Sequence, residues 1–143
     1  MALQHLPDAD YADAFTVASN SDAVARSWAQ LALESGPVRV APRSKQLVWH
    51  GLLGFTLAED GSPDTLAGWS IALDEPRTFV IACDGRLMRS RMIFGTADGT
   101  ATWTTALCFH GRLGRAVWAG AQHAHRAIAP RILSRAATAL DSR

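Results

Sequence analysis

The sequence predicts an α+β fold in which a long C-terminal helix packs across an antiparallel sheet. Between Leu66 and His110 the apolar residues recur every second position, and short turn sequences separate the runs. From about Leu113 to Leu140 the chain is rich in Ala, Leu and Arg, which favour a helix. Strands joined by short turns pair antiparallel, so the helix is expected to cover one face of a meander.

The N-terminal part predicts one short strand followed by two short helices. Ala12–Ala18 alternates weakly and is expected to form the first strand. Asn20 and its neighbours supply helix-capping side chains, and a helix is predicted from about Asp22 to Glu34. A second short helix is predicted around Leu47–Leu53, where apolar residues gather on one side before a glycine.

Four strands are predicted after Leu66, each with one apolar face. Arg89 and Arg91 fall on the face opposite the methionines, and the simpler interpretation places both arginines in solvent. The alternative buries them to bind a carboxylate, which is costly without partners. The residues expected to share the apolar faces are Trp69, Ile71 and Leu73; Phe79, Ile81 and Cys83; Met88, Ser90, Met92 and Phe94; and Trp103, Thr105, Leu107 and Phe109.

The closing helix predicts an apolar stripe and an interruption. Pro130 lacks a backbone donor and its ring collides with the carbonyl four residues earlier, so a kink is expected there. The expected stripe contains Val117, Ala121, Ala124, Ile128 and Ile132, with Trp118 on its flank.

Length and composition predict one globular domain spanning residues 1–143. The net charge of +1 favours neither nucleic acid nor a membrane surface as a partner. No secretory signal or membrane-length apolar run is seen, so a cytoplasmic location is expected. Cys83 and Cys108 are expected to be buried free thiols in a reducing compartment, although a disulfide between adjacent strands is the alternative.

Two stretches resemble a known family. They are Leu6–Val17 (LPDADYADAFTV) and His110–Ile128 (HGRLGRAVWAGAQHAHRAI), which contains a His, then R-L-G-R, then H-R. Both are similar to the DUF2867 family of unknown function, within the START-like (SRPBCC) superfamily of polyketide cyclases and lipid-transfer domains. The resemblance implies a helix-grip fold with an apolar cavity between the closing helix and the sheet, and it implies no reaction. The family tends to have a proline near position 123, where this chain has His123.

The candidate ligand site combines aromatic residues with a basic rim. Trp69, Trp103 and Trp118 are expected to contact an apolar or aromatic molecule, while plain core packing is the alternative. The rim residues lie where the last strand meets the last helix, and they are expected to hold an anion or a carbonyl beside the helix N-terminal amides. The alternative pairs these arginines with acids such as Asp8, Asp10 or Asp13. The rim residues are His110, Arg112 and Arg115.

Metal and cofactor chemistry has no support in the sequence. His123 and His125 lie about 200° apart around a helix, so they do not chelate one ion, and we expect no metal. No P-loop, nucleophile elbow, CxxC or dinucleotide-binding glycine pattern is present, and we expect no cofactor. His125 is expected instead to hydrogen-bond a backbone or acidic group and to lock the helix onto the sheet.

Three functions are compatible with these features. The first is binding of an apolar or aromatic small molecule between the closing helix and the sheet. The second is a cyclase- or dehydratase-like enzyme on the same scaffold, with His110 as acid or base. The third is a ligand-free interaction or accessory domain that docks by its basic helix or forms a homodimer.

Overall fold

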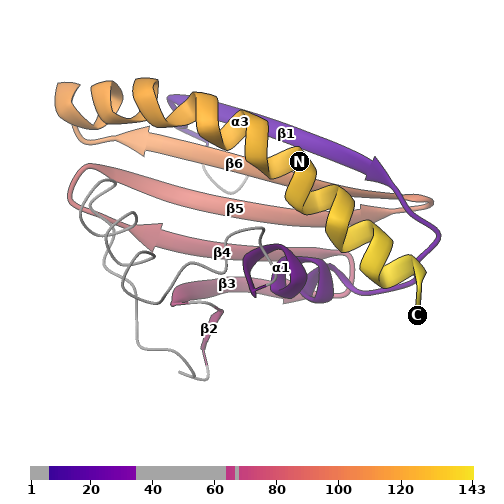
Figure 1. Cartoon of the computed structure of the whole chain (residues 1–143). Helices are drawn as coiled ribbons and strands as arrows, with labels where there is room; N and C mark the ends of the chain where they lie inside the picture. Colours follow the sequence, from indigo (N-terminus) through magenta and orange to yellow (C-terminus); the bar gives the residue numbers. More distant parts are fainter. Residues whose placement is uncertain (1–6, 35–63, 67) are drawn as a thin grey trace.

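The computed structural model describes residues 7–34, 64–66 and 68–143. The second short helix predicted around Leu47–Leu53 lies outside the described residues. Within the described part, the chain forms six strands and two helices (Figure 1). They are β1 (Tyr11–Ala18), α1 (Ala25–Glu34), β2 (Thr65–Leu66), β3 (Trp69–Glu75), β4 (Thr78–Asp84), β5 (Met88–Ala97), β6 (Thr100–Phe109) and α3 (Arg112–Asp141).

The strands form one antiparallel sheet in the order β1-β6-β5-β4-β3-β2. The meander predicted from the two-residue period is therefore confirmed, and the first strand joins it at β6. The tight turn before β6 contains Gly99, whose φ of 76° is readily adopted only by a residue without a Cβ. The two-residue strand β2 was not predicted, because a segment this short has no period to detect.

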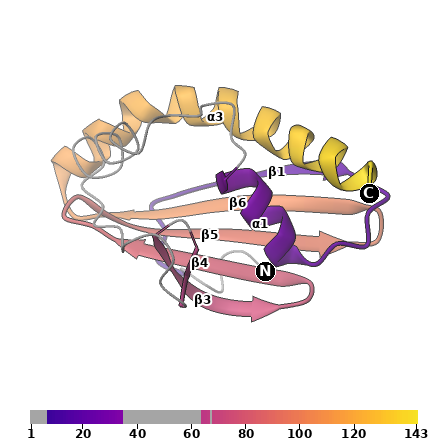
Figure 2. The same cartoon turned by 60° about the horizontal axis from the view of Figure 1, so that its bottom comes forward.

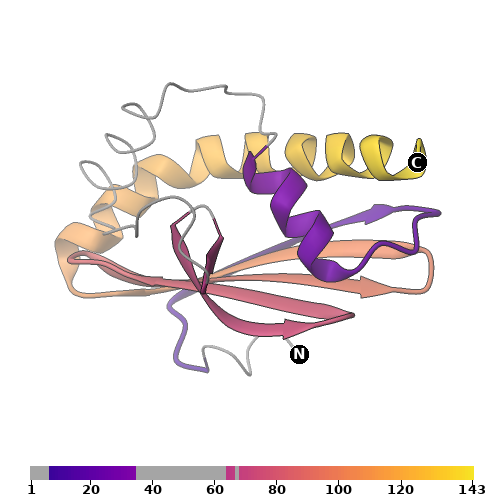
Figure 3. The same cartoon turned by 90° about the horizontal axis from the view of Figure 1, so that it is seen from below.

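Both helices lie on the same face of the sheet (Figures 2 and 3). α3 crosses above β1 and β6, and α1 lies beside it above β3, β4 and β5. A long C-terminal helix held against an antiparallel sheet is the helix-grip arrangement, and the predicted α+β class is confirmed. The predicted limits of the closing helix, Leu113 and Leu140, each differ from the observed limits by one residue. Among the described helices, none has the length and apolarity required to span a membrane.

The core lies between the helices and the inner face of the sheet. Phe79 pairs with Phe94 and Ile81 pairs with Met92 across β4 and β5, and all four side chains are buried. This confirms the predicted inward face of both strands. On β3 a register shift between Ile71 and Leu73 places these two residues on opposite faces, so the prediction that they share a face was wrong.

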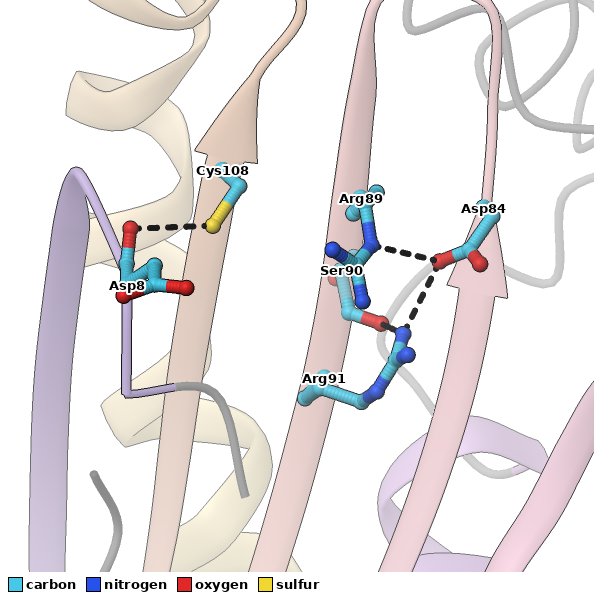
Figure 4. A network of polar contacts seen from close by, with 6 residues as sticks. All are labelled: Asp8, Asp84, Arg89, Ser90, Arg91 and Cys108. Carbon is cyan, nitrogen blue, oxygen red and sulfur yellow. Dashed lines mark hydrogen bonds and ion pairs between the residues drawn. The ribbon is translucent and has the colours of Figure 1, made fainter. Parts of the chain in front are cut away.

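The opposite, outer face of the sheet carries the two arginines of β5. Arg91 Nη1 donates to Asp84 Oδ1 at 2.9 Å and also to the Ser90 carbonyl, while Arg89 Nε lies 3.7 Å from the same carboxylate (Figure 4). The interpretation with the arginines outside and the methionines inside is confirmed.

Both cysteines are free thiols, as expected. Cys83 is buried on the inner face of β4, whereas Cys108 belongs to the outer face of β6 and is only partly buried. Cys108 Sγ donates to the Asp8 carbonyl at 3.1 Å (Figure 4). Because the two thiols lie on opposite faces of the sheet, the alternative of a disulfide is wrong.

α1 begins at Ala25, three residues later than predicted. Ala25 N donates to the Pro76 carbonyl at 2.9 Å, so the start of the helix is fixed to the turn between β3 and β4. Arg26 Nη1 then bonds Asp74 Oδ2 at 2.5 Å. Val24 precedes the helix and is exposed.

The predicted stripe of α3 is confirmed for Val117, Ala121 and Ile132, which pack against the core, and is wrong for its other two members. Ala124 and Ile128 are exposed, whereas His125 and Ala129 face inward. The polar ring of His125 takes a partly buried, inward position. The prediction considered apolar residues alone and therefore selected the neighbouring Ala124. The buried residues of α3 are Gly114, Trp118, Ala129, Leu133, Ala136, Ala137 and Leu140. The helix runs through Pro130, and the kink expected there stays a prediction.

Gly114 sets the distance between α3 and the hairpin that joins β4 to β5. A Cβ at this position would lie 2.2 Å from the carbonyl oxygen of Leu87, which no real contact permits. That carbonyl also accepts a hydrogen bond from His110 N at 2.9 Å. The R-L-G-R sequence therefore has a structural reason for its glycine, because only a residue without a side chain lets the helix begin so close to the hairpin.

Candidate functional site

Beneath the middle of α3, an acidic residue of β1 meets a histidine of the helix. His125 Nε2 lies 3.1 Å from Asp13 Oδ2 and 3.3 Å from Oδ1. Both side chains are largely enclosed, with exposed fractions of 16% for His125 and 9% for Asp13. The prediction that His125 bonds an acidic group and ties the helix to the sheet is confirmed, and the acid is 112 positions away in the sequence.

Aromatic rings from three elements surround the imidazole of His125. Its ring centroid lies 5.3 Å from Trp118 of α3, 5.9 Å from Trp103 of β6 and 6.2 Å from Phe15 of β1. Tyr11 of β1 meets Trp118 edge-on, with ring centroids 5.2 Å apart. These distances are typical of favourable aromatic packing, and the rings form an enclosure around one polar pair. Thr105 of β6 lies opposite Asp13 in the pairing of β6 with β1. We call the set Tyr11, Asp13, Phe15, Trp103, Thr105, Trp118 and His125 the dyad cluster.

Two further side chains continue the polar contacts to the surface. Tyr11 Oη donates to Asp13 Oδ2 at 2.5 Å, and Arg126 Nε donates to Tyr11 Oη at 3.1 Å. Burial raises the pKa of Tyr11 above its ordinary value; the bond to Asp13 acts in the same direction, and Arg126 opposes both. The same bond to Tyr11 raises the pKa of Arg126. Tyr11 is thus held as a neutral phenol between the carboxylate of Asp13 and the guanidinium of Arg126.

The hydrogen bonding assigns separate roles to the two ring nitrogens of His125. A carboxylate only accepts hydrogen bonds, so its contact with Nε2 places a proton on that nitrogen. In the neutral ring, Nδ1 then keeps a lone pair, and it forms no bond to a described residue. An imidazole oriented by an acid in this way is suited to accepting a proton or a hydrogen bond from a bound molecule.

Three buried polar atoms in the dyad cluster have no hydrogen-bond partner within the described part of the chain. They are Trp103 Nε1, Trp118 Nε1 and Thr105 Oγ1, and each belongs to a residue that is at most 7% exposed. An unsatisfied buried donor costs about 1–3 kcal/mol of stability. A core selected for stability alone would use apolar side chains here, so this concentration of unpaired donors marks the cluster as unusual.

The structure brings together two of the tryptophans predicted to line a ligand site. Trp103 and Trp118 both contact His125, as described. Trp69 is buried on β3, with β4 and β5 lying between it and β6, so it belongs to a different part of the core. The strand order separates Trp69 from the other two tryptophans, and contact of all three with one ligand stays a prediction.

The basic rim residues lie apart from the dyad cluster, at the exposed start of α3. Arg115 Nη2 is 3.8 Å from Asp10 Oδ1, and its guanidinium lies over the ring of Phe109 at 5.3 Å. The alternative that paired an arginine with a nearby acid is confirmed for Arg115. His110 and Arg112 are exposed. A role for these three residues in ligand binding stays a prediction.

Sequence reasoning missed Asp13 and Tyr11 as members of the site. Asp13 lies two residues before Phe15 and four before Val17, and residues two apart share one face of a strand. The period of β1 therefore places the Asp13 carboxylate on the same inward face as these apolar side chains. That signal was available, because a carboxylate on an apolar strand face needs a buried partner. The identity of the partner was not available, since nothing local links β1 to the middle of α3. Among the described residues, no group of three or more His, Cys, Asp or Glu side chains forms a metal site.

Neither the family models nor the curated proteins compared with this chain gave a match. A solved structure titled "Crystal structure of Ara h 8.0201" is similar, with a TM-score of 0.42 and 16% sequence identity. The alignment covers 88% of this chain and 98% of that chain. The helix-grip assignment for this chain rests on its own strand order and on the placement of α3.

Proposed function

We propose that this protein binds a small aromatic or apolar molecule between α3 and the sheet, at the dyad cluster. The observation that carries the proposal is the Asp13–His125 pair enclosed by aromatic rings. A buried polar pair is often less stabilising than apolar residues of the same volume, so its presence favours a role other than packing. Aromatic walls with a few converging polar groups are the usual composition of a ligand site.

The resemblance of the sequence to the START-like superfamily supports the same proposal. We infer that the chain is a divergent relative of the DUF2867 family. In this chain, Gly114 of the R-L-G-R sequence seats the helix against the Leu87 carbonyl. We also propose a reducing compartment such as the cytoplasm, since Cys83 and Cys108 are both free thiols.

Ligand binding is tested by tryptophan fluorescence and thermal unfolding with a panel of aromatic compounds and fatty acids. A ligand present at 100 times its Kd is expected to stabilise the fold by about 2.7 kcal/mol. Trp118→Leu should weaken binding at least about tenfold, since it removes a wall of the cluster. His110→Ala and Arg112→Ala serve as matched controls at the exposed start of α3, and they should leave the Kd of uncharged ligands unchanged. A panel with no fluorescence change and no thermal shift would sink the proposal.

A second candidate is proton-transfer catalysis on the same scaffold, with His125 in the role that the sequence had suggested for His110. The oriented Asp13–His125 pair favours it, because Asp13 fixes the tautomer and leaves Nδ1 as a base. The test is exchange of the α-protons of a bound ketone in deuterated water, followed by NMR. His125→Gln should abolish the exchange while ligand affinity remains, and unchanged exchange in that variant rules the candidate out.

A further inference from the structure

The dyad cluster contains two buried indole N–H groups that have no acceptor in the described part of the chain. An indole Nε1–H donates and never accepts, so Trp103 and Trp118 each require an acceptor atom. Both rings pack against His125, so the two unpaired donors belong to residues that contact the same imidazole. Trp28 also has an unpaired Nε1, but it belongs to α1 and lies outside the cluster.

The carboxylate acceptor of the cluster is already engaged, and neither indole donor reaches an acceptor in the described part of the chain. The carboxylate of Asp13 receives the hydroxyl of Tyr11 and faces Nε2 of His125. Thr105 Oγ1 is itself without a partner within the described part of the chain. A bound molecule that presents an oxygen acceptor would therefore satisfy groups that the described protein atoms leave unpaired.

The charge of the cluster restricts the kind of oxygen. Asp13 is an enclosed carboxylate next to His125, and in this low-dielectric setting it repels a second negative charge strongly. A neutral carbonyl accepts hydrogen bonds without this penalty. The aromatic rings of Phe15, Trp103 and Trp118 supply flat apolar surface for the remainder of the molecule.

We propose that the dyad cluster selects neutral aromatic carbonyl compounds, and that the indole donors of Trp103 and Trp118 are the residues that read the carbonyl oxygen. This inference rests on the proposed binding function and adds the ligand class to it. A site built to hydrogen-bond a polar group discriminates against an analogue that lacks the group, because its buried donors are then left unpaired.

The experiment compares three ligands of one shape by titration calorimetry on the full chain. They are acetonaphthone, which has a neutral carbonyl, ethylnaphthalene, which has no oxygen, and naphthoate, which is anionic. Acetonaphthone should bind the wild-type protein about tenfold more tightly than either of the others, as expected for one or two buried hydrogen bonds. Calorimetry is chosen because the variants below remove tryptophans and would alter a fluorescence signal.

Trp103→Phe and Trp118→Phe keep an aromatic ring but remove the donor. Each should reduce the preference for acetonaphthone over ethylnaphthalene about threefold or more, while the Kd for ethylnaphthalene changes less than about twofold. Trp28→Phe is the matched control, because it removes an unpaired indole donor outside the cluster and should leave the preference unchanged. Thr105→Val provides a second variant with little change in volume if a tryptophan variant fails to fold.

The outcomes separate this inference from the proposed function. Equal affinity of the wild-type protein for acetonaphthone and ethylnaphthalene overturns the carbonyl preference and leaves small-molecule binding intact. Undiminished preference in folded Trp103→Phe and Trp118→Phe removes these residues as its cause. Absence of binding by all three ligands, together with a silent wider panel, overturns both proposals.

Discussion

The inner face of the sheet is divided into two halves that differ in polarity. Beneath α1, the strands β3, β4 and β5 present mainly large apolar side chains, such as Phe79 and Ile81, which are fully buried. Beneath α3, the strands β1 and β6 present Asp13 and Thr105 beside aromatic rings. One sheet and one covering layer therefore contain two kinds of interior.

The difference indicates how stability and the proposed binding function are divided within the fold. Complete burial of apolar side chains stabilises the α1 half, where each fully buried residue contributes about 1.5–3 kcal/mol. The α3 half retains unpaired donors and an enclosed carboxylate–imidazole pair, which reduce its contribution to stability. Sites that bind ligands commonly accept such costs, and the rest of the domain compensates for them.

The largest expected effect comes from opening the apolar half. Phe79→Ala should reduce the free energy of unfolding by about 3–5 kcal/mol, because it removes a fully buried ring and leaves a cavity. Phe15→Ala in the α3 half removes the same atoms from a partly buried position and should cost about half as much. Urea denaturation of the two variants measures the contrast, and equal losses would contradict the division into halves.

The seating of α3 should be the next most sensitive feature. Gly114→Ala places a methyl group against the Leu87 carbonyl and should destabilise the protein by about 1–3 kcal/mol. Gly120→Ala is the matched control in the same helix, because a Cβ there meets no atom within 4 Å. That control should gain up to about 1 kcal/mol from helix propensity. Thermal unfolding compares the two, and a neutral Gly114→Ala would mean that the helix shifts freely.

Removal of an unpaired hydroxyl should have a smaller effect with the opposite sign. Thr105→Val replaces a buried oxygen that lacks a partner in the described part of the chain, and it should stabilise the protein by about 1 kcal/mol. Thr104→Val on the outer face, also buried, should change stability by less than about 0.5 kcal/mol. A loss of stability in Thr105→Val would show that its hydroxyl is bonded in solution.

The smallest expected effect is a loss of folding stability at alkaline pH, and it arises from the ionisation of Tyr11. Its pKa is raised in the folded protein, so the neutral phenol contributes stability that is fully present below pH 10 and is lost as the pH rises through the folded pKa. Tyr11 is the single tyrosine of the chain, so the absorbance of tyrosinate reports its titration directly. Asp13→Asn should lower the observed midpoint, because it removes an acceptor that favours the neutral phenol. A midpoint at or below that of free tyrosine in the wild-type protein would contradict the enclosure of this ring.

The sequence predicted the fold well because its signals are local. The two-residue period of Met88–Phe94 identifies its inward face within a single strand, and the helix-forming residues after Leu113 identify α3. The start of α1 was misplaced because a backbone bond to Pro76, distant in sequence, sets it. The bulge at Leu73 was missed because it depends on pairing with the neighbouring strand.

The site was predicted less well, since it depends on contacts between distant segments. Trp103 and Trp118 were identified because aromatic residues are visible in any sequence. Trp69 was grouped with them because strand order is not encoded locally. The His110–Arg115 motif led to a predicted binding rim at the start of α3. The histidine that the structure encloses is His125, more than two helical turns further along.

The pairing of β1 with β6 has a consequence for how the protein is made. β1 leaves the ribosome before the other described elements, yet its only neighbour in the described sheet is β6, about 90 residues later in the chain. Until β6 is synthesised, β1 has no neighbouring strand with which to form backbone hydrogen bonds. The contact between Asp13 and His125 forms later still, because His125 follows β6 in the sequence. At typical rates of synthesis this interval lasts several seconds, during which an alternating, aggregation-prone strand is exposed. The α1 half, whose strands are adjacent in sequence, is expected to fold first, and the binding half is expected to assemble last.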